Sequence, residues 1–314
     1  MLLKFNEYFD MKAADQLAVE QLNEKLIIVG NGAKYGQVIF LAGGAGSGKG
    51  FAIKNFMQGE LYKVRDVDEF KKAYLELAKI TGRYPEVSRL NLKNPDDVFA
   101  LHMFVKQKGI KNKTLNILLK DMLSLNSAKK GTLPNIIFDI TLQDFDDIAE
   151  VVPKLIEVGY ETKNIHLTWV LTNYKIAAEN NAKRDRVVPI RVLMGTHQGA
   201  STTMLQVVQG KTPKVIGGQV NVILNNPEHT FFYQDNSGKN APTTNKMKNA
   251  YKTTGTALGT GKTGRAVIKD FKYINLKKEG KPFINDAALS KQLYMWITKN
   301  VPKKTIKNME IPKQ

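Results

Sequence analysis

The residues with the clearest chemical potential are a lysine and several glycines in LAGGAGSGKGF, residues 41–51. Gly43, Gly48 and Lys49 match the phosphate-binding pattern G-x-x-x-x-G-K-[ST], except that Gly50 stands in the Ser/Thr position. In such a loop, backbone N–H groups surround phosphate oxygens and the lysine reaches the β- and γ-phosphates. Because the hydroxyl that helps to hold Mg²⁺ is replaced, a metal ion must use water and another protein group. The residues expected to contact phosphate are Gly43, Gly44, Ala45, Gly46, Ser47, Gly48, Lys49, Gly50 and Phe51.

The segments on either side of this loop have the periodicity that it requires. QVIFLAG at 37–43 is typical of a buried strand, and 51–57 carries apolar residues at helical spacing. A glycine turn that merely looks like a phosphate site is the alternative, and these flanks argue against it. Downstream, strand-like runs at 61–67, 135–140, 164–171 and 220–224 alternate with helical patterns at 69–80, 96–107, 113–125, 145–158 and 174–184. This alternation predicts an α/β fold of the P-loop NTPase type, a three-layer sandwich with a mainly parallel sheet.

Three carboxylates follow predicted strands, where parallel sheets bind their ligands. Asp66 and Asp68 come after the second strand, and Asp139 closes the third. Asp139 is a candidate ligand for Mg²⁺, directly or through water, or else an ordinary polar residue at a strand end. Asp68 could orient an acceptor hydroxyl and accept its proton, or cap the helix that follows, and one residue could do both.

Basic and polar residues beyond the fourth helix supply further candidates. Arg184 and Arg186 could close over a transferring phosphate, although arginines also favour solvated helix ends. The stretch MGTHQGASTTM at 194–204 is interpreted as a substrate-facing loop. His197 within it could bind phosphate or acceptor, and a structural histidine is the competing interpretation.

The order of these motifs resembles that of the zeta-toxin kinases and the kinase half of polynucleotide kinases, over about residues 36–210. The resemblance rests on the glycine loop, on Asp68-Glu69-Phe70-Lys71 after the second strand, and on the third strand with its acid-x-Thr end. It implies that Asp68 is the catalytic base, that Asp139 and Thr141 face the acceptor or metal, and that Arg184 and Arg186 clamp phosphates. Lys71 stands where the family has an arginine, which removes the bidentate phosphate geometry. Asp139 is shorter than the glutamate usual in zeta kinases, which puts a sugar-nucleotide acceptor in doubt.

Composition limits the partners and the location. The 314 residues carry 47 Lys and Arg against 29 Asp and Glu, a net charge of +18, with no cysteine and four histidines. These counts exclude disulfides, thiol chemistry and cysteine-based zinc sites, and the four scattered histidines argue against any other zinc centre. The basic excess favours a nucleic-acid partner, with a generally basic, solvated surface as the alternative. Early charge in MLLKFNEYFDMKAADQ and the lack of an apolar run of about 18 residues indicate a cytoplasmic protein without membrane contact.

The expected organisation has three parts. Residues 1–35 form an N-terminal segment that packs on the core, 36–234 form the kinase core with a lid at about 184–210, and 235–314 form a basic C-terminal extension of the same domain. Within the extension, 255–265 is a poor second copy of the glycine loop and a better match to a flexible basic loop. VIKDFKYINL favours a strand, 287–298 a closing helix, and the residues from Pro302 a loose tail.

The sequence therefore predicts a kinase that uses ATP and Mg²⁺ to phosphorylate a hydroxyl of a nucleotide unit, favoured within DNA or RNA. A free nucleotide or sugar nucleotide is the alternative acceptor. A nucleotide-dependent nucleic-acid-binding protein or NTPase without an acceptor is the alternative from another class. The oligomeric state stays open.

Overall fold

The computed structural model describes residues 27, 29–30, 35–57, 59–128, 132–232, 268–284 and 286–302. Its strands are β1 (Val38–Ala42), β2 (Tyr62–Asp66), β3 (Asn135–Asp139), β4 (Ile165–Leu171), β5 (Val220–Leu224), β6 (Thr230–Phe232) and β7 (Ile268–Lys277). Its α-helices are α2 (Lys49–Asn55), α3 (Val67–Thr81), α4 (Pro85–Ser88), α5 (Pro95–Gln107), α6 (Ile110–Ala128), α7 (Asp146–Val158), α8 (Tyr174–Ala182), α9 (Ile190–Val208) and α11 (Ala287–Asn300). Short 3₁₀ turns are η2 (Gly59–Leu61), η3 (Thr162–Asn164) and η4 (Pro227–His229).

One sheet organises the described residues, in the order β2-β3-β1-β4-β5-β7-β6. The pairs among β1 to β5 are parallel, and β7 is antiparallel to both of its neighbours. Parallel strands need helical crossovers, which accounts for the alternation along the chain. The carboxyl ends of β1, β2, β3 and β4 consequently meet at one edge of the sheet.

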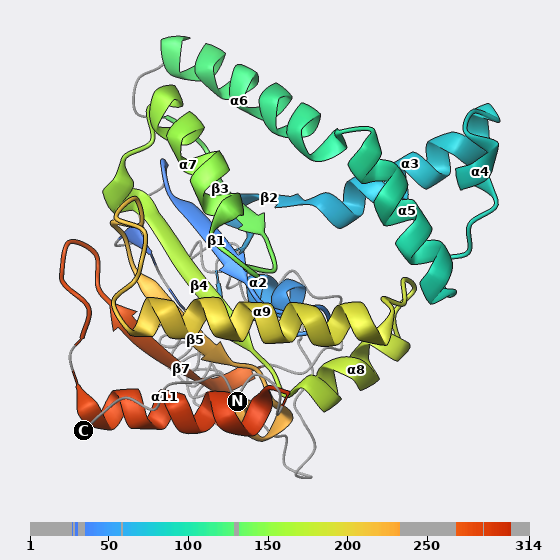
Figure 1. Ribbon diagram of the computed structural model, residues 1–314. Coiled ribbons are helices and arrows are strands. Elements are labelled where there is room, and N and C mark those ends of the chain that lie inside the picture. The colour runs from blue at the N-terminus through green and yellow to red at the C-terminus, as the bar shows by residue number, and fades with distance from the viewer. Residues whose placement is uncertain are drawn as a thin grey trace, which may run out of the picture.

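Apolar side chains alternate between the two faces of the strands and create two cores. Phe40 and Phe138 stack at 5.2 Å on one face, in a cluster that includes residues of α6, α7, α9 and α11. Ile39 and Ile137 face the other way and pack with Phe56 at the end of α2. Helices thus cover both faces, as Figure 1 shows, and the predicted three-layer α/β sandwich of the P-loop NTPase type is confirmed.

A helical arm, defined here as α3, α4, α5 and the first turns of α6, is inserted between β2 and β3 and extends to one side of the sheet (Figure 1). It has a small core of its own, in which Tyr84 and Phe104 make an edge contact at 5.3 Å between ring centroids. Because this core is separate from the two sheet cores, the arm is a distinct wall beside the carboxyl end of β2.

The structure corrects two expectations and supports others. The predicted loop at 194–204 is wrong, because these residues lie inside α9. Asp68 is not a helix cap: β2 ends at Asp66, and the Asp66 side chain caps α3 by accepting a 2.8 Å hydrogen bond from the Asp68 amide. Residues 268–276 of VIKDFKYINL lie in β7 and 287–298 lies in α11, both as predicted.

Several predicted segments lie outside the described residues. These are most of 1–35, all of 255–265 and the tail beyond Pro302. Ile27 and Val29, from the first of these segments, belong to the core under α2. Among the described residues, no helix is both long and apolar enough to cross a membrane.

Candidate active site

The glycine loop between β1 and α2 has the backbone geometry of a phosphate cradle. Gly46 and Gly48 adopt φ of 75° and 85°, values that favour glycine, and Gly48 is the residue before the first turn of α2. No side chain caps α2, so its first N–H groups are directed at the space above the loop. An anion placed there would meet those N–H groups and the positive end of the helix dipole.

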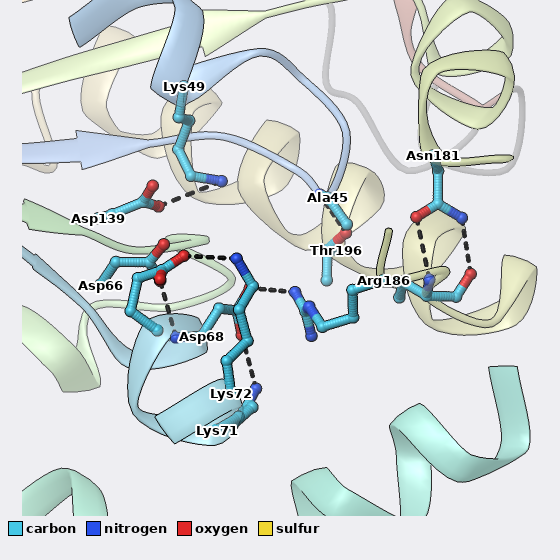
Figure 2. A network of polar contacts seen from close by, with 12 residues as sticks. Ala45, Lys49, Asp66, Asp68, Lys71, Lys72, Asp139, Asn181, Arg186 and Thr196 are labelled. Atoms are coloured by element: carbon cyan, nitrogen blue, oxygen red, sulfur yellow. Dashed lines mark hydrogen bonds and ion pairs between the residues drawn. The ribbon is translucent and has the colours of Figure 1, made fainter. Parts of the chain in front are cut away.

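Lys49 points back across the loop. Its Nζ donates a 2.8 Å hydrogen bond to the Gly43 carbonyl and lies 3.4 Å from Asp139 Oδ1 (Figure 2). Asp139 is in turn the strand partner of Asp66, since the two residues pair across β2 and β3. The lysine therefore lies where the loop meets the acidic ends of two neighbouring strands.

Side chains from distant segments hold the loop from behind. Thr196 accepts a 3.0 Å hydrogen bond from the Ala45 amide, and His197 Nε2 donates to the Ala45 carbonyl at 2.9 Å. Thr172 and Asn225 donate to the Ser47 carbonyl at 2.6 and 2.9 Å. Burial lowers the pKa of His197 below its usual value, so a neutral ring supports the loop.

The carboxylates at the strand ends differ in their tendency to ionise. Burial raises the pKa of Asp139 to about 6; Lys49 opposes this shift and Asp66 and Asp68 add to it. Burial also raises the pKa of Asp66, with Asp68 contributing repulsion. These carboxylates are therefore crowded, and a cation beside them would relieve the repulsion.

Asp68 lies between two cations. Lys71 Nζ is 2.8 Å from Asp68 Oδ1, and Arg186 contacts Asp68 Oδ2 from the other side (Figure 2). Burial acts to raise the pKa of Asp68, but Lys71 and Arg186 outweigh it, and the pKa falls below its usual value. The side chain is consequently an anion throughout the neutral range.

The arginine segment, residues 183–189, is attached both to α8 and to the helical arm. Asn181 donates to the Val188 carbonyl at 2.8 Å and accepts from the Val188 amide at 3.0 Å. The Val187 amide donates to the Leu92 carbonyl in the arm at 2.9 Å, and Lys93 Nζ donates to the Arg184 carbonyl at 2.7 Å. The position of Arg186 therefore depends on the arm as well as on α8.

These groups surround one cleft of about 500 Å³ at the carboxyl edge of the sheet. Of the predicted site residues, the cleft is lined by Ala45, Gly46, Ser47, Gly48, Lys49, Gly50, Asp68, Lys71, Asp139, Thr141, Arg184 and Arg186. Four predicted residues do not line the cleft, namely Gly43, Gly44, Phe51 and His197. His197 is beneath the glycine loop, and Phe51 is 39% exposed and packs edge-on against Phe56.

Sequence reasoning missed several residues that line the cleft, namely Arg65, His102, Lys111, Asp147 and Asn180. Arg65 is buried, donates a 2.7 Å hydrogen bond to the Lys111 carbonyl and lies over the Phe138 ring. No local signal marked it, because β2 reads YKVRD and only Arg65 in it is buried. His102 and Lys111 belong to the arm, and no local pattern distinguishes them from solvated helix residues.

The fold and this loop define a P-loop NTPase-type α/β protein. No family model matches the sequence, and no curated protein matches it. Among solved structures, the chain is similar to one from a study titled as the molecular and structural characterization of the PezAT chromosomal toxin–antitoxin system of Streptococcus pneumoniae. That similarity has 16% identity and a TM-score of 0.37, and covers 68% of this chain and 75% of the other. At this distance it carries no argument about activity.

Proposed function

We propose that the protein is a P-loop kinase that transfers the γ-phosphoryl group of ATP to a hydroxyl group of an acceptor. One observation carries the proposal: Asp68 and the phosphate-binding loop line the same open cleft, with Arg186 beside the carboxylate. A phosphoryl-transfer site needs a phosphate cradle, a carboxylate for the acceptor hydroxyl and a cation for the transferring group. An NTPase without an acceptor would need only a space large enough for water beside the γ-phosphate.

The loop fits a nucleoside triphosphate. Gly44, Gly46 and Gly48 let the loop pack closely on its neighbours: an added Cβ would lie 2.3, 2.4 and 2.2 Å from an atom of His197, Ala177 and Asn225 respectively. Lys49 would leave the Gly43 carbonyl and bind the β- and γ-phosphates, since a phosphate oxygen is the stronger acceptor for an ammonium group.

The residues present also fit Mg²⁺, through oxygen ligands. Asp139, with its raised pKa, and Asp66 beside it would hold the ion, because a cation removes the repulsion between them. When bound, the ion neutralises charge on the phosphate oxygens. Gly50 offers no hydroxyl, so the carboxylates take a larger share of the binding than in loops with Ser or Thr.

Asp68 would orient the acceptor hydroxyl and take its proton. The hydroxyl oxygen attacks the γ-phosphorus and a new P–O bond forms. The bond from the γ-phosphorus to the β,γ-bridging oxygen breaks, and ADP leaves. Arg186 would move from Asp68 to the transferring phosphate as charge develops there, which frees the carboxylate for the proton.

The acceptor we favour is a nucleotide unit within DNA or RNA, because of the net charge of +18. Ten Lys and Arg against two acidic residues in 242–282 support this choice, although most of that stretch lies outside the described residues. A free nucleotide or a sugar nucleotide is the alternative within the same reaction class.

The test is incubation with γ-labelled ATP and a panel of DNA, RNA, nucleotides and sugar nucleotides, with the label separated into organic product and inorganic phosphate. Label in an organic product supports a kinase and identifies the acceptor. Release of inorganic phosphate alone, with every acceptor, would contradict it.

The polymer acceptor has its own test, which is a salt titration of oligonucleotide binding. Reversing the charge of Lys262, Arg265, Lys269 and Lys272 together should weaken binding and polymer phosphorylation and leave ATP binding unchanged. If neither the wild type nor this variant binds at about 50 mM salt, the polymer acceptor is excluded.

A further inference from the structure

A second hollow of about 410 Å³ lies between α3, α5, the start of α6 and Glu150 of α7. Among the described residues, Glu150 is the one carboxylate that lines it, and it lies 3.7 Å from Lys111 Nζ. The hollow shares Val67, Lys71, His102 and Lys111 with the cleft, so the two spaces adjoin each other. Asp68, the carboxylate proposed to hold the acceptor hydroxyl, contacts Lys71 at this junction. An acceptor whose hydroxyl is at Asp68 therefore lies beside the second hollow.

The cations around this hollow are not equally compensated. Lys71 is paired with Asp68, and Lys111 contacts Asp147 and lies 3.7 Å from Glu150. Lys106 lies one turn after His102 on α5 and lines the hollow. Among the described residues, Lys106 forms no ion pair. Lys106 is thus available to an anion from outside the chain.

The pKa of His102 is affected by the cations around its ring. Burial lowers its pKa first, and Lys71, Lys106 and Arg186 lower it further, while only Asp68 opposes them. The local potential at the imidazole is therefore positive, even with the neighbouring carboxylate counted. The rim also includes Gly109 and Asn112 at the first turn of α6, where helix N–H groups and an amide favour an anion.

We propose that this hollow binds a phosphate group that the acceptor already carries, with Lys106 and His102 as its main contacts. The inference rests on the proposed function and assigns a binding site to the phosphate group that its acceptor carries. A phosphate has several oxygens that accept from the ammonium, the imidazole and the Asn112 amide together, whereas a neutral sugar would leave the Lys106 charge without a partner.

The binding site can be tested without any transfer reaction. Inorganic phosphate and pyrophosphate are titrated into the protein while the His102 ring resonances are followed by NMR across pH, with His102→Gln to assign them among the four histidines. An anion beside the ring should raise the pKa of His102. The shift should be lost in Lys106→Ala and kept in Lys113→Ala, which removes a lysine from the same region that lines neither hollow. No response of His102 in the wild-type protein would overturn the site.

The acceptor assignment is tested by kinetics with pairs of acceptors that differ only in one phosphate group. Lys106→Ala should raise KM for the phosphorylated member about tenfold, the value of one partly exposed charge-assisted contact, with little change for the other member. Equal transfer to both members in the wild type would overturn the inference and leave the kinase proposal standing. A His102 response to phosphate without transfer to any acceptor would keep the site and contradict the kinase.

Discussion

Gly44 is the loop position where the structure makes the sharpest prediction about stability. A Cβ built on it would lie 2.3, 2.5 and 2.6 Å from three atoms of the His197 ring. The ring is 4% exposed and bonded to the Ala45 carbonyl, so it has little freedom to move aside. Gly44→Ala should therefore force the loop and α9 apart.

The expected cost of Gly44→Ala is about 1–3 kcal/mol, the usual range for inserting a methyl group into a packed interior. His197→Ala removes the clashing ring, so adding Gly44→Ala to that variant should cost nearly nothing. The coupling between the two changes should then equal the cost of Gly44→Ala alone. Gly50→Ala is the matched control: its Cβ would meet nothing within 4 Å, and an alanine in the first turn of α2 should add roughly 0.5–1 kcal/mol of stability.

The assay is urea denaturation of the four proteins of this cycle and of the control, monitored by two optical probes. ATP affinity, measured in parallel, should fall in Gly44→Ala because the cradle is displaced. An equal cost of Gly44→Ala with and without the His197 ring would show that this packing is not what the glycine accommodates.

Three further predictions concern the site. Asp68→Asn should keep ATP affinity and lower transfer roughly 10²- to 10⁴-fold, the usual worth of a positioned base, as measured by binding and initial rates; unchanged transfer would reassign the role. The metal-free protein should lose stability as pH rises from about 4 to 6, because the pKa of Asp139 is about 6 in the fold against 3.8 ordinarily and the folded state holds the proton more tightly. The raised pKa corresponds to a loss of about 3 kcal/mol, and Asp139→Asn should remove this loss when urea midpoints are measured in EDTA at several pH values. Equal pH dependence of stability in the wild type and the variant would contradict this prediction. Asn181→Ala leaves the Val188 amide and carbonyl unpaired, so the free energy of unfolding should fall by about 1–3 kcal/mol and phosphoryl transfer should slow because Arg186 is displaced. Urea denaturation that shows full stability would refute this.

Local patterns were sufficient for the parts of the fold that combine burial with a clear period. β1, β3, β4 and β5 are rich in apolar residues and buried along almost their whole length, as expected for a parallel sheet between two helical layers. Lys49 and Asp139 could be placed together because both adjoin the carboxyl ends of neighbouring strands. The sequence was therefore most informative about the site residues that lie at the carboxyl ends of the strands.

Tertiary packing explains why residues 194–204 were misassigned. Glycine, serine and threonine disfavour a helix, yet α9 passes close to the segment before α7. A Cβ on Gly199 would lie 2.9 Å from the Gln143 side chain, and Thr203 donates a hydrogen bond to the Gln143 carbonyl at 2.7 Å. The small and hydroxylated residues permit that close approach, a requirement that is invisible along the chain.

The residue that caps α3 could not be assigned from the sequence, for a different reason. Asp66 and Asp68 are two residues apart, and either could have ended the strand or begun the helix. The strand stops at Asp66, which takes the cap and leaves the Asp68 carboxylate for Lys71 and Arg186. The pairing with Arg186 spans 118 residues and depends on the arm, so no local pattern could reveal it.

The central claim is tested most directly by single-turnover transfer from γ-labelled ATP to the best acceptor, with wild-type protein and Lys49→Ala side by side. Lys49 is the lysine that we propose binds the β- and γ-phosphates, from its place at the start of α2. The account predicts labelled acceptor from the wild type and almost none from a Lys49→Ala protein whose circular dichroism and urea midpoint show an intact fold. Near-wild-type transfer by that folded variant would contradict the claim that this loop binds the phosphates of ATP.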